Sequence, residues 1–301
     1  MSRNVILSTS PDNRLVNDAG PVQGDEAPTD DISPDWQARM GRVRDAVADW
    51  RSKLLDPPAV ADGSPLAGDD KAFPSMPCSQ LAWWGISVAV EHLDATIRAL
   101  DQQVSVGGPI LPSANFTVLR AALVGASHAV ALLGPTGRAD RTTAGLQMAY
   151  EEYRQALNFR EKVLTSPGLV ERARLASATT DRLAHLRGRL AEVSALLAQR
   201  SAPKKLTDTS IVERAAGLVH AAGKGDSELL QLALQMEWAL GSGAAHGRLL
   251  MALHRVGGHH IEDATALFGA TYDEVAQEIS SVTLVLNEAW RLWTLRNTPP
   301  Y

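Results

Sequence analysis

The chain has 301 residues and a net charge of −5, with 45% hydrophobic and 21% charged residues. This balance supplies enough apolar surface for a packed core, and frequent alanine with only 5% aromatic residues favours helices over a β-sandwich or barrel. A single cysteine, Cys78, excludes an intramolecular disulfide and a cysteine-rich zinc site.

Residues 1–32 differ in composition from the rest of the chain. They are rich in Pro, Gly, Asn and Asp, they show no apolar period, and acidic side chains outnumber basic ones. Such a segment cannot bury enough surface to offset its chain entropy, so we expect a disordered acidic arm. The remainder, 33–301, is then close to neutral and is expected to form a single all-α domain. A near-neutral body argues against DNA as a partner.

The first helix is expected to follow Ser33, which can cap it, with Pro34 and Asp35 in its first turn. Apolar residues then recur every three or four positions until Asp56. Residues 57–78 are rich in Pro, Gly and Asp, which indicates a long loop. Broad apolar stripes predict two further helices, 79–103 and 113–133, the second apolar nearly all round and therefore the most buried.

Two long amphipathic segments follow, and they predict an antiparallel helical hairpin over about 139–200 that projects from the core. Residues 201–209 have the composition of a linker. The remaining helices are expected at 210–222, 227–255 and 272–296, with a Gly/His loop before the last one. The expected architecture is therefore a helical bundle of about seven helices. No apolar run reaches the roughly 18 residues of a membrane span, so we expect a soluble, cytoplasmic protein with no membrane partner.

Three glycines, Gly241, Gly243 and Gly247, interrupt the apolar helical pattern of 238–255. Each costs about 1 kcal/mol relative to Ala in a helix. Their presence there indicates a close approach of two helices or a bend of the backbone.

Within the same segment, Trp238, Ser242 and His246 are spaced by four residues and share one helix face. A serine and a histidine beside a close helical contact predict a small polar binding pocket inside the bundle. The alternative interpretation is a core histidine bonded to main-chain or side-chain groups.

Basic residues predict a second candidate site. Arg120 and His128 lie two turns apart in an Ala/Val-rich helix, and Arg138 and Arg141 follow it. A buried arginine needs a charged partner or a bound anion, and guanidinium groups suit phosphate or carboxylate. These four residues therefore predict an anion or nucleotide pocket. The alternative is ion pairs to acidic neighbours: Asp140, Glu151 and Glu152.

Metal and cofactor motifs are weak in this sequence. Histidines and acids cluster around His259, His260, Glu262 and Asp263, but there is no HExxH string. There is also no GxSxG, Walker or dinucleotide-binding string. We therefore expect neither a metal nor a cofactor.

The string WALGSGAAHG resembles an element near the end of helical proteins in the HEPN superfamily, and LRAALVGASHAVALLGPTGRADR resembles an arginine-bearing helix of all-helical actinobacterial relatives. HEPN ribonucleases share an arginine that is followed by a histidine. The arginine would stabilise the phosphate charge, and the histidine would assist proton transfer from the ribose hydroxyl. That resemblance implies Arg248 and His254 as catalytic residues. Leu249 stands where the family usually has a polar residue, and many HEPN-like domains are noncatalytic. Two other Arg–His pairs have similar spacing: Arg214–His220 and Arg255–His260.

Three functions are consistent with these patterns. The first is a noncatalytic helical interaction protein that binds a protein partner or a second copy of itself, with a small polar pocket near His246. The second is a metal-independent HEPN-type endoribonuclease acting on RNA through Arg248 and His254. The third is a scaffold or assembly protein whose 139–200 hairpin makes the contacts.

Overall fold

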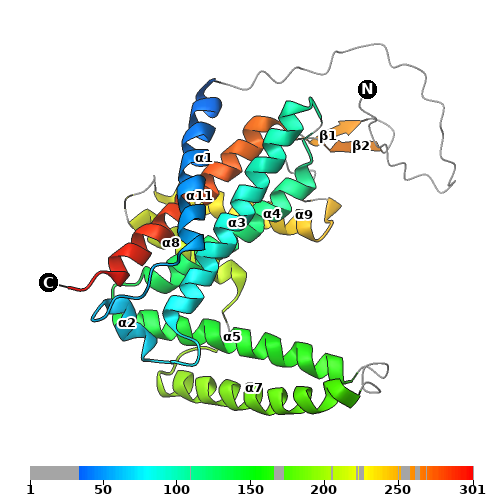
Figure 1. Cartoon of the computed structure of the whole chain (residues 1–301). Helices are drawn as coiled ribbons and strands as arrows, with labels where there is room; N and C mark the ends of the chain where they lie inside the picture. The colour runs from blue at the N-terminus through cyan, green and yellow to red at the C-terminus, as the bar shows by residue number, and fades with distance from the viewer. Residues whose placement is uncertain are drawn as a thin grey trace, which may run out of the picture. The chain divides into compact units, whose positions relative to one another are not determined.

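The structure, a computed structural model, describes residues 34–108, 110–165, 173–204, 206–221, 223, 227–249, 251, 258–261, 265–268 and 270–300. These residues are predominantly helical, which confirms the expected fold class (Figure 1). The acidic arm expected over 1–32 lies outside the described residues.

The chain divides into two compact units, each assembled from three separate stretches. Unit 1 contains Met1–Asp56, Ala89–Leu123 and Leu232–Leu284. Unit 2 contains Pro57–Val88, Val124–Gln231 and Val285–Tyr301. Each unit is described by itself below, and the single domain expected over 33–301 stays a prediction.

Unit 1 contains α1 (Pro34–Leu55) and parts of α3 (Cys78–Ser105), α4 (Pro112–Leu133), α9 (Ser227–Ala245) and α11 (Tyr272–Asn297). The first helix begins at Pro34, as its capping signals predict, and it buries one apolar face: Met40, Val43, Val47 and Trp50. Arg44 and Arg51 of α1 form ion pairs with Asp101 and Asp94 of α3. This helix is therefore held by an apolar stripe and by ion pairs beside it.

Among the described helices, only α4 is long and apolar enough to cross a membrane by length and composition. Of its apolar window, 67% is buried inside the structure, which is typical of the core helix of a soluble protein. This agrees with the expectation that it is a strongly buried helix. A cytoplasmic location stays a prediction.

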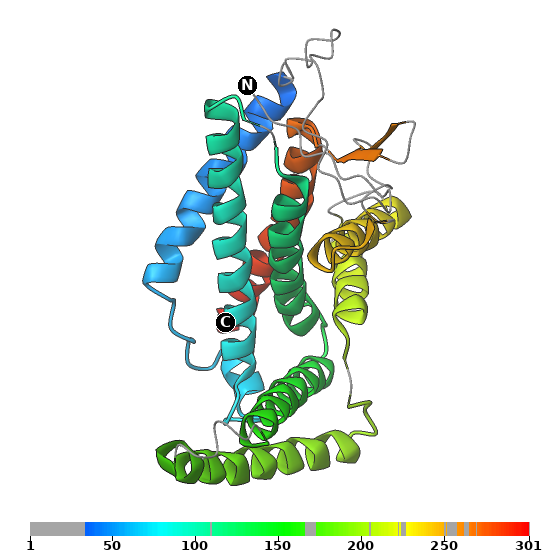
Figure 2. The ribbon, with the colours of Figure 1, turned by 90° about the vertical axis from the view of Figure 1, so that its right-hand side faces the viewer.

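Unit 2 contains α2 (Pro65–Asp70), α5 (Arg138–Leu164), α7 (Ala173–Gln199) and α8 (Asp208–Ala221), with the other parts of α3, α4, α9 and α11. Helices α5 and α7 lie side by side (Figure 2). They run in opposite directions, since Arg187 pairs with Glu161 while Arg200 donates to Thr142. A core cluster packs at this contact: Phe73, Leu146, Ala149, Tyr153, Leu186, Val193 and Leu197. That the pair projects from a bundle stays a prediction.

Three expected elements differ in the structure. The loop expected over 57–78 contains the short helix α2, which Ser64 caps by accepting from the amide of Ala67. The helix expected to reach Arg255 ends at Ala245, because Gly247 adopts a positive φ of 61° and the Arg248 amide bonds back to Gly243. The expected Gly/His loop contains two short antiparallel strands, β1 (Gly258–Ile261) and β2 (Thr265–Phe268).

Candidate functional site

A cavity of about 260 Å³ opens in unit 2 between α3, α4, α5 and α8. We call it the Trp84 hollow. Its apolar lining comes from Leu81, Met148, Leu206 and Ile211, and Trp84 stands beside them. The Trp84 side chain is 66% exposed, so most of this large ring faces solvent. The hollow therefore combines an apolar wall with an uncovered aromatic ring.

The backbone holds Trp84 in place through a tight contact of α3 with α4. A Cβ at the neighbouring Gly85 would lie 2.6 Å from the Gly125 carbonyl oxygen and 3.4 Å from the His128 Cβ. Only a glycine allows the two helix backbones to approach this closely. This contact fixes the spacing between Trp84 and His128, which both line the hollow.

The polar part of the lining is acidic. Glu151 accepts hydrogen bonds from Arg154 and Gln155, and Glu152 is exposed. Asp208 lies in the first turn of α8, where a carboxylate is favourable, with an oxygen 3.9 Å from His128 Nε2. Among the described residues that line the hollow, none is lysine or arginine.

The N-terminus of α8 is capped by the side chains of Thr207 and Ser210. The Ser210 amide donates to Thr207 Oγ1 over 3.2 Å, and the Thr207 amide donates to Ser210 Oγ over 3.0 Å. Thr207 also lines the hollow. Reciprocal capping of this kind fixes the first turn of the helix, and with it the position of Asp208.

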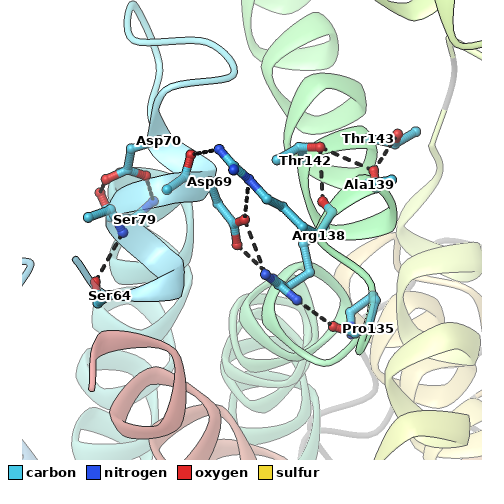
Figure 3. A network of polar contacts seen from close by, with 12 residues as sticks. Ser64, Asp69, Asp70, Ser79, Pro135, Arg138, Ala139, Thr142 and Thr143 are labelled. Atoms are coloured by element: carbon cyan, nitrogen blue, oxygen red, sulfur yellow. Dashed lines mark hydrogen bonds and ion pairs between the residues drawn. The ribbon is translucent and has the colours of Figure 1, made fainter. Parts of the chain in front are cut away.

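The predicted arginines of unit 2, Arg138 and Arg141, form ion pairs with Asp69, and we call these three residues the Asp69 cluster. Figure 3 shows Asp69 and Arg138 of this cluster. Asp69 is 1% exposed, and Arg141 grips it with two hydrogen bonds: Nε to Oδ2 at 2.6 Å and Nη2 to Oδ1 at 3.2 Å. The remaining terminal nitrogen of Arg141 donates to the carbonyls of Pro135 and Thr136.

Arg138 lies nearer the surface of this cluster. It donates to the Gly68 carbonyl, and its Nε lies 3.6 Å from an Asp69 oxygen. The structure thus gives Arg141 an internal partner in place of the anion expected from the sequence. That partner is Asp69, not the neighbouring acids Asp140, Glu151 or Glu152.

A further arginine, Arg296 of α11, closes the turn between α4 and α5. It donates to the carbonyls of Leu133 and Pro135, both over 3.0 Å. Burial lowers the pKa of Arg296, and the charge of Arg141 lowers it further. The turn is therefore tied from two sides by guanidinium groups, an arrangement that stabilises the fold.

In unit 1, the glycine-interrupted helix contacts α4 closely, as the sequence predicts. A Cβ at Gly241 would lie 2.8 Å from the Arg120 Cβ and 3.0 Å from the Phe116 carbonyl oxygen. The Arg120 guanidinium carbon lies 5.9 Å from the centre of the Trp238 ring, within the range of a cation–π contact. Two predicted binding residues, Arg120 and Trp238, are thus brought together.

One residue of the predicted polar pocket, His246, is not placed as expected. Ser242 is half-buried in α9, but His246 is exposed in the turn beyond the end of this helix. The expectation assumed a helix continuing past His246, and Gly247 ends it first. His246 therefore does not point to an interior pocket.

The catalytic pair implied by the HEPN resemblance cannot be assembled from the described residues. Arg248 is exposed, while His254 lies outside the described residues. Glu262 and Asp263 of the predicted histidine-acid cluster also lie outside the described residues. Elsewhere in the described part of the chain, no three His, Cys, Asp or Glu side chains are placed to hold a metal ion.

One half-buried acid, Glu237 of α9, whose Oε2 atom is buried, was not singled out from the sequence. Burial raises its pKa to about 8, and a hydrogen bond from Ser281 opposes this only in part. Among the described residues, its Oε2 has no hydrogen-bond partner. The signal was present in the sequence, since Glu237 is the one charged residue between Leu229 and Leu240.

Comparison with known proteins adds no relative: no family model, curated protein or solved structure matches the chain.

Proposed function

We propose that the chain is a noncatalytic helical binding protein and that the Trp84 hollow is its binding site. The observation that carries the proposal is the exposed indole of Trp84 beside a cavity of about 260 Å³. Tryptophan is enriched among the residues that dominate binding energy, because one ring supplies a large apolar area and a polar N–H. An exposed aromatic ring that continues the apolar wall of a cavity is typical of a surface that a ligand covers.

The noncatalytic part of the proposal is supported by the chemistry of the lining. The hydroxyl group at the hollow, that of Thr207, is engaged with Ser210 in the cap of α8. His128 Nε2 lies 3.9 Å from an Asp208 oxygen, beyond hydrogen-bond distance. The lining is suited to holding a group and has no activated nucleophile.

The test is a fragment screen on the full chain labelled with 5-fluorotryptophan. The Trp84 resonance is assigned by its loss in Trp84→Phe. We expect fragments from a mixed library of cationic, neutral and anionic compounds to shift this resonance, and Trp36 of α1 to serve as the internal control. A library in which no compound moves Trp84 would overturn the proposal.

The ribonuclease alternative predicts a different result from the same protein. It requires cleavage of RNA without metal, lost in His254→Ala while the helical circular dichroism signal persists. We expect RNA to stay intact over a wide range of protein concentrations. Metal-independent cleavage that depends on Arg248 and His254 would replace the binding proposal with the enzymatic one.

A further inference from the structure

We infer that Gln147 is a positioning residue for the Trp84 hollow, because its hydrogen bond to Pro203 holds the wall formed by Leu206 and Thr207 in place beside α5. The inference deepens the proposed function and rests on it, since it names what sets the shape of the proposed binding site. It also gives a role to the segment after α7, which has the composition of a linker.

The connection between α7 and α8 forms one side of the hollow. Leu206 and Thr207 line the cavity, and α8 begins directly after them at Asp208. Most described residues of this connection are exposed, but Ala202 and Leu206 are half-buried. Ala202 packs against the core cluster between α5 and α7. Two apolar side chains therefore fix the course of an otherwise exposed segment.

Gln147 adds a polar tie between these two points. It lies on α5 next to Met148, which lines the hollow, and it is 6% exposed. Its Nε2 donates to the Pro203 carbonyl oxygen over 2.8 Å, across 56 residues of sequence. Among the described residues from 203 to 207, this is the one hydrogen bond to α5 or α7. A buried amide is costly unless it is bonded, so this position suits the hydrogen bond more than it suits packing.

The start of the connection is fixed by other groups. Ser201 adopts a positive φ of 52°, which is uncommon for a residue other than glycine, and the Ala202 amide donates back to the Leu197 carbonyl. Arg200 donates to Thr142 Oγ1 of α5 over 2.6 Å. These bonds end α7 and turn the chain without help from Gln147, so Gln147 governs the part of the connection beyond Ala202.

The bond from Gln147 is expected to shape the hollow more than it stabilises the fold. Pro203 is exposed, so water can bind its carbonyl oxygen when the glutamine is replaced. Gln147 does not itself line the hollow, so it acts on a ligand only through the residues that do. Its loss is therefore expected to be felt at Leu206 and Thr207.

The experiment follows this wall with a cysteine placed on it. Leu206→Cys is made in the full chain, and its reaction with iodoacetamide is timed by mass spectrometry. The native thiol, Cys78, gives little background, because it is 6% exposed and burial raises its pKa to about 12. Glu213→Cys, at an exposed position of α8 outside the hollow, reports the reactivity of an open thiol.

Gln147→Met keeps the size of the side chain and removes the donor. We expect it to speed the reaction of Leu206→Cys by about 3- to 10-fold, because one hydrogen bond no longer opposes local opening, and to leave Glu213→Cys unchanged. Gln147→Asn shortens the amide by one methylene and is expected to act in the same direction, so the test does not depend on one variant folding. Gln235→Met, at a half-buried glutamine of α9, is the matched control and is expected to change neither rate.

Fluorine spectra connect the wall to binding. In Gln147→Met labelled with fluorotryptophan, we expect the Trp84 resonance to shift while the Trp36 resonance and the far-UV circular dichroism stay as in the parent. Fragments that bind the parent at Trp84 are expected to bind Gln147→Met about 3- to 10-fold more weakly, since the wall that they contact is held in place less often.

The outcomes separate this inference from the proposed function. An unchanged reaction rate of Leu206→Cys would overturn the inference, and so would an equal acceleration of Leu206→Cys and Glu213→Cys, which indicates general loosening. If fragments bind Gln147→Met as tightly as the parent, the hollow is a binding site that Gln147 does not position, and the inference fails alone. If Leu206→Cys accelerates but no fragment moves Trp84 in the parent, the proposed function fails, whereas the hold of Gln147 on the wall is supported.

Discussion

The Asp69 cluster and the Trp84 hollow, both in unit 2, use the same kinds of side chain for different ends. In the cluster, a carboxylate that is 1% exposed is gripped by Arg141, whose other donors are bound to carbonyls. At the hollow, the carboxylates of Glu152 and Asp208 face a cavity whose described lining has neither lysine nor arginine. The cluster is closed by internal ion pairs, whereas the hollow leaves an apolar wall and the Trp84 ring open to solvent. An apolar surface left open beside polar groups, more than residue type, separates a candidate site from a structural ion pair.

The largest expected effect comes from breaking the complete cluster. Arg141→Ala leaves the Asp69 carboxylate buried without its main partner, and this is expected to lower the free energy of unfolding by about 3–5 kcal/mol. Urea unfolding followed by far-UV circular dichroism measures the loss. The control is Arg138→Ala, whose side chain is 59% exposed and whose pair with Asp69 is expected to contribute at most about 1 kcal/mol. Equal losses in the two variants would show that the cluster is not the closed unit described here.

The carboxyl group of Glu237 in unit 1, whose Oε2 is buried, extends the comparison to the dependence of stability on pH. Its pKa is raised from 4.5 to about 8, so the folded chain binds more protons than the unfolded chain between these values. The associated stability is complete below pH 4.5 and is lost as the pH rises to about 8. The slope reaches at most about 1.4 kcal/mol per pH unit.

Glu237→Gln is expected to remove this decline and to be more stable than the parent by about 2–4 kcal/mol near pH 8. The measurement is the unfolding midpoint in urea from pH 4 to pH 9 for both proteins. Parallel curves over that range would contradict the assignment of a neutral buried carboxyl.

A smaller effect is expected where the backbone shapes the hollow. Gly85→Ala places a Cβ 2.6 Å from the Gly125 carbonyl oxygen, so α3 and α4 must separate at a cost of about 1–3 kcal/mol. The same shift moves Trp84 and His128 apart and is expected to weaken fragment binding.

The matched control is Gly188→Ala on α7, where a Cβ has open space. This change is expected to stabilise by about 0.5–1 kcal/mol, because alanine is the better helix former. Thermal unfolding and the fluorine spectrum of Trp84 measure both effects. A Gly85→Ala protein as stable as the parent and with unchanged binding would show that the contact does not set the shape of the hollow.

Helix positions could be predicted well because they follow from local period and capping. The start of α1 at Pro34 and the extent of α4 needed only apolar spacing and terminal residues. The end of α9 was missed because three glycines looked alike in the sequence. Gly241 allows a close helix contact, whereas Gly247 adopts a left-handed backbone that ends the helix. Spacing does not distinguish these two uses of glycine.

Of the residues that line the Trp84 hollow, only His128 was predicted from the sequence as a binding residue. Trp84 lies within the apolar stripe that predicts the helix over 79–103, and periodicity does not show whether a neighbour covers such a stripe. Asp69 was missed because its partner, Arg141, is 72 residues away, and long-range ion pairs leave no mark in local spacing. The exposure of Trp84 and the Asp69–Arg141 ion pair both depend on tertiary contacts, which local patterns in a single sequence do not reveal.

The bonds from Arg296 to the carbonyls of Leu133 and Pro135 also bear on biosynthesis. The ribosome makes these two carbonyls more than 150 residues before the guanidinium group that binds them, as the sequence separations of 163 and 161 show. Until Arg296 has been synthesised, the turn between α4 and α5 therefore lacks the hydrogen bonds from its guanidinium group. Unit 2 acquires its complete set of internal bonds only after Arg296 has emerged from the ribosome.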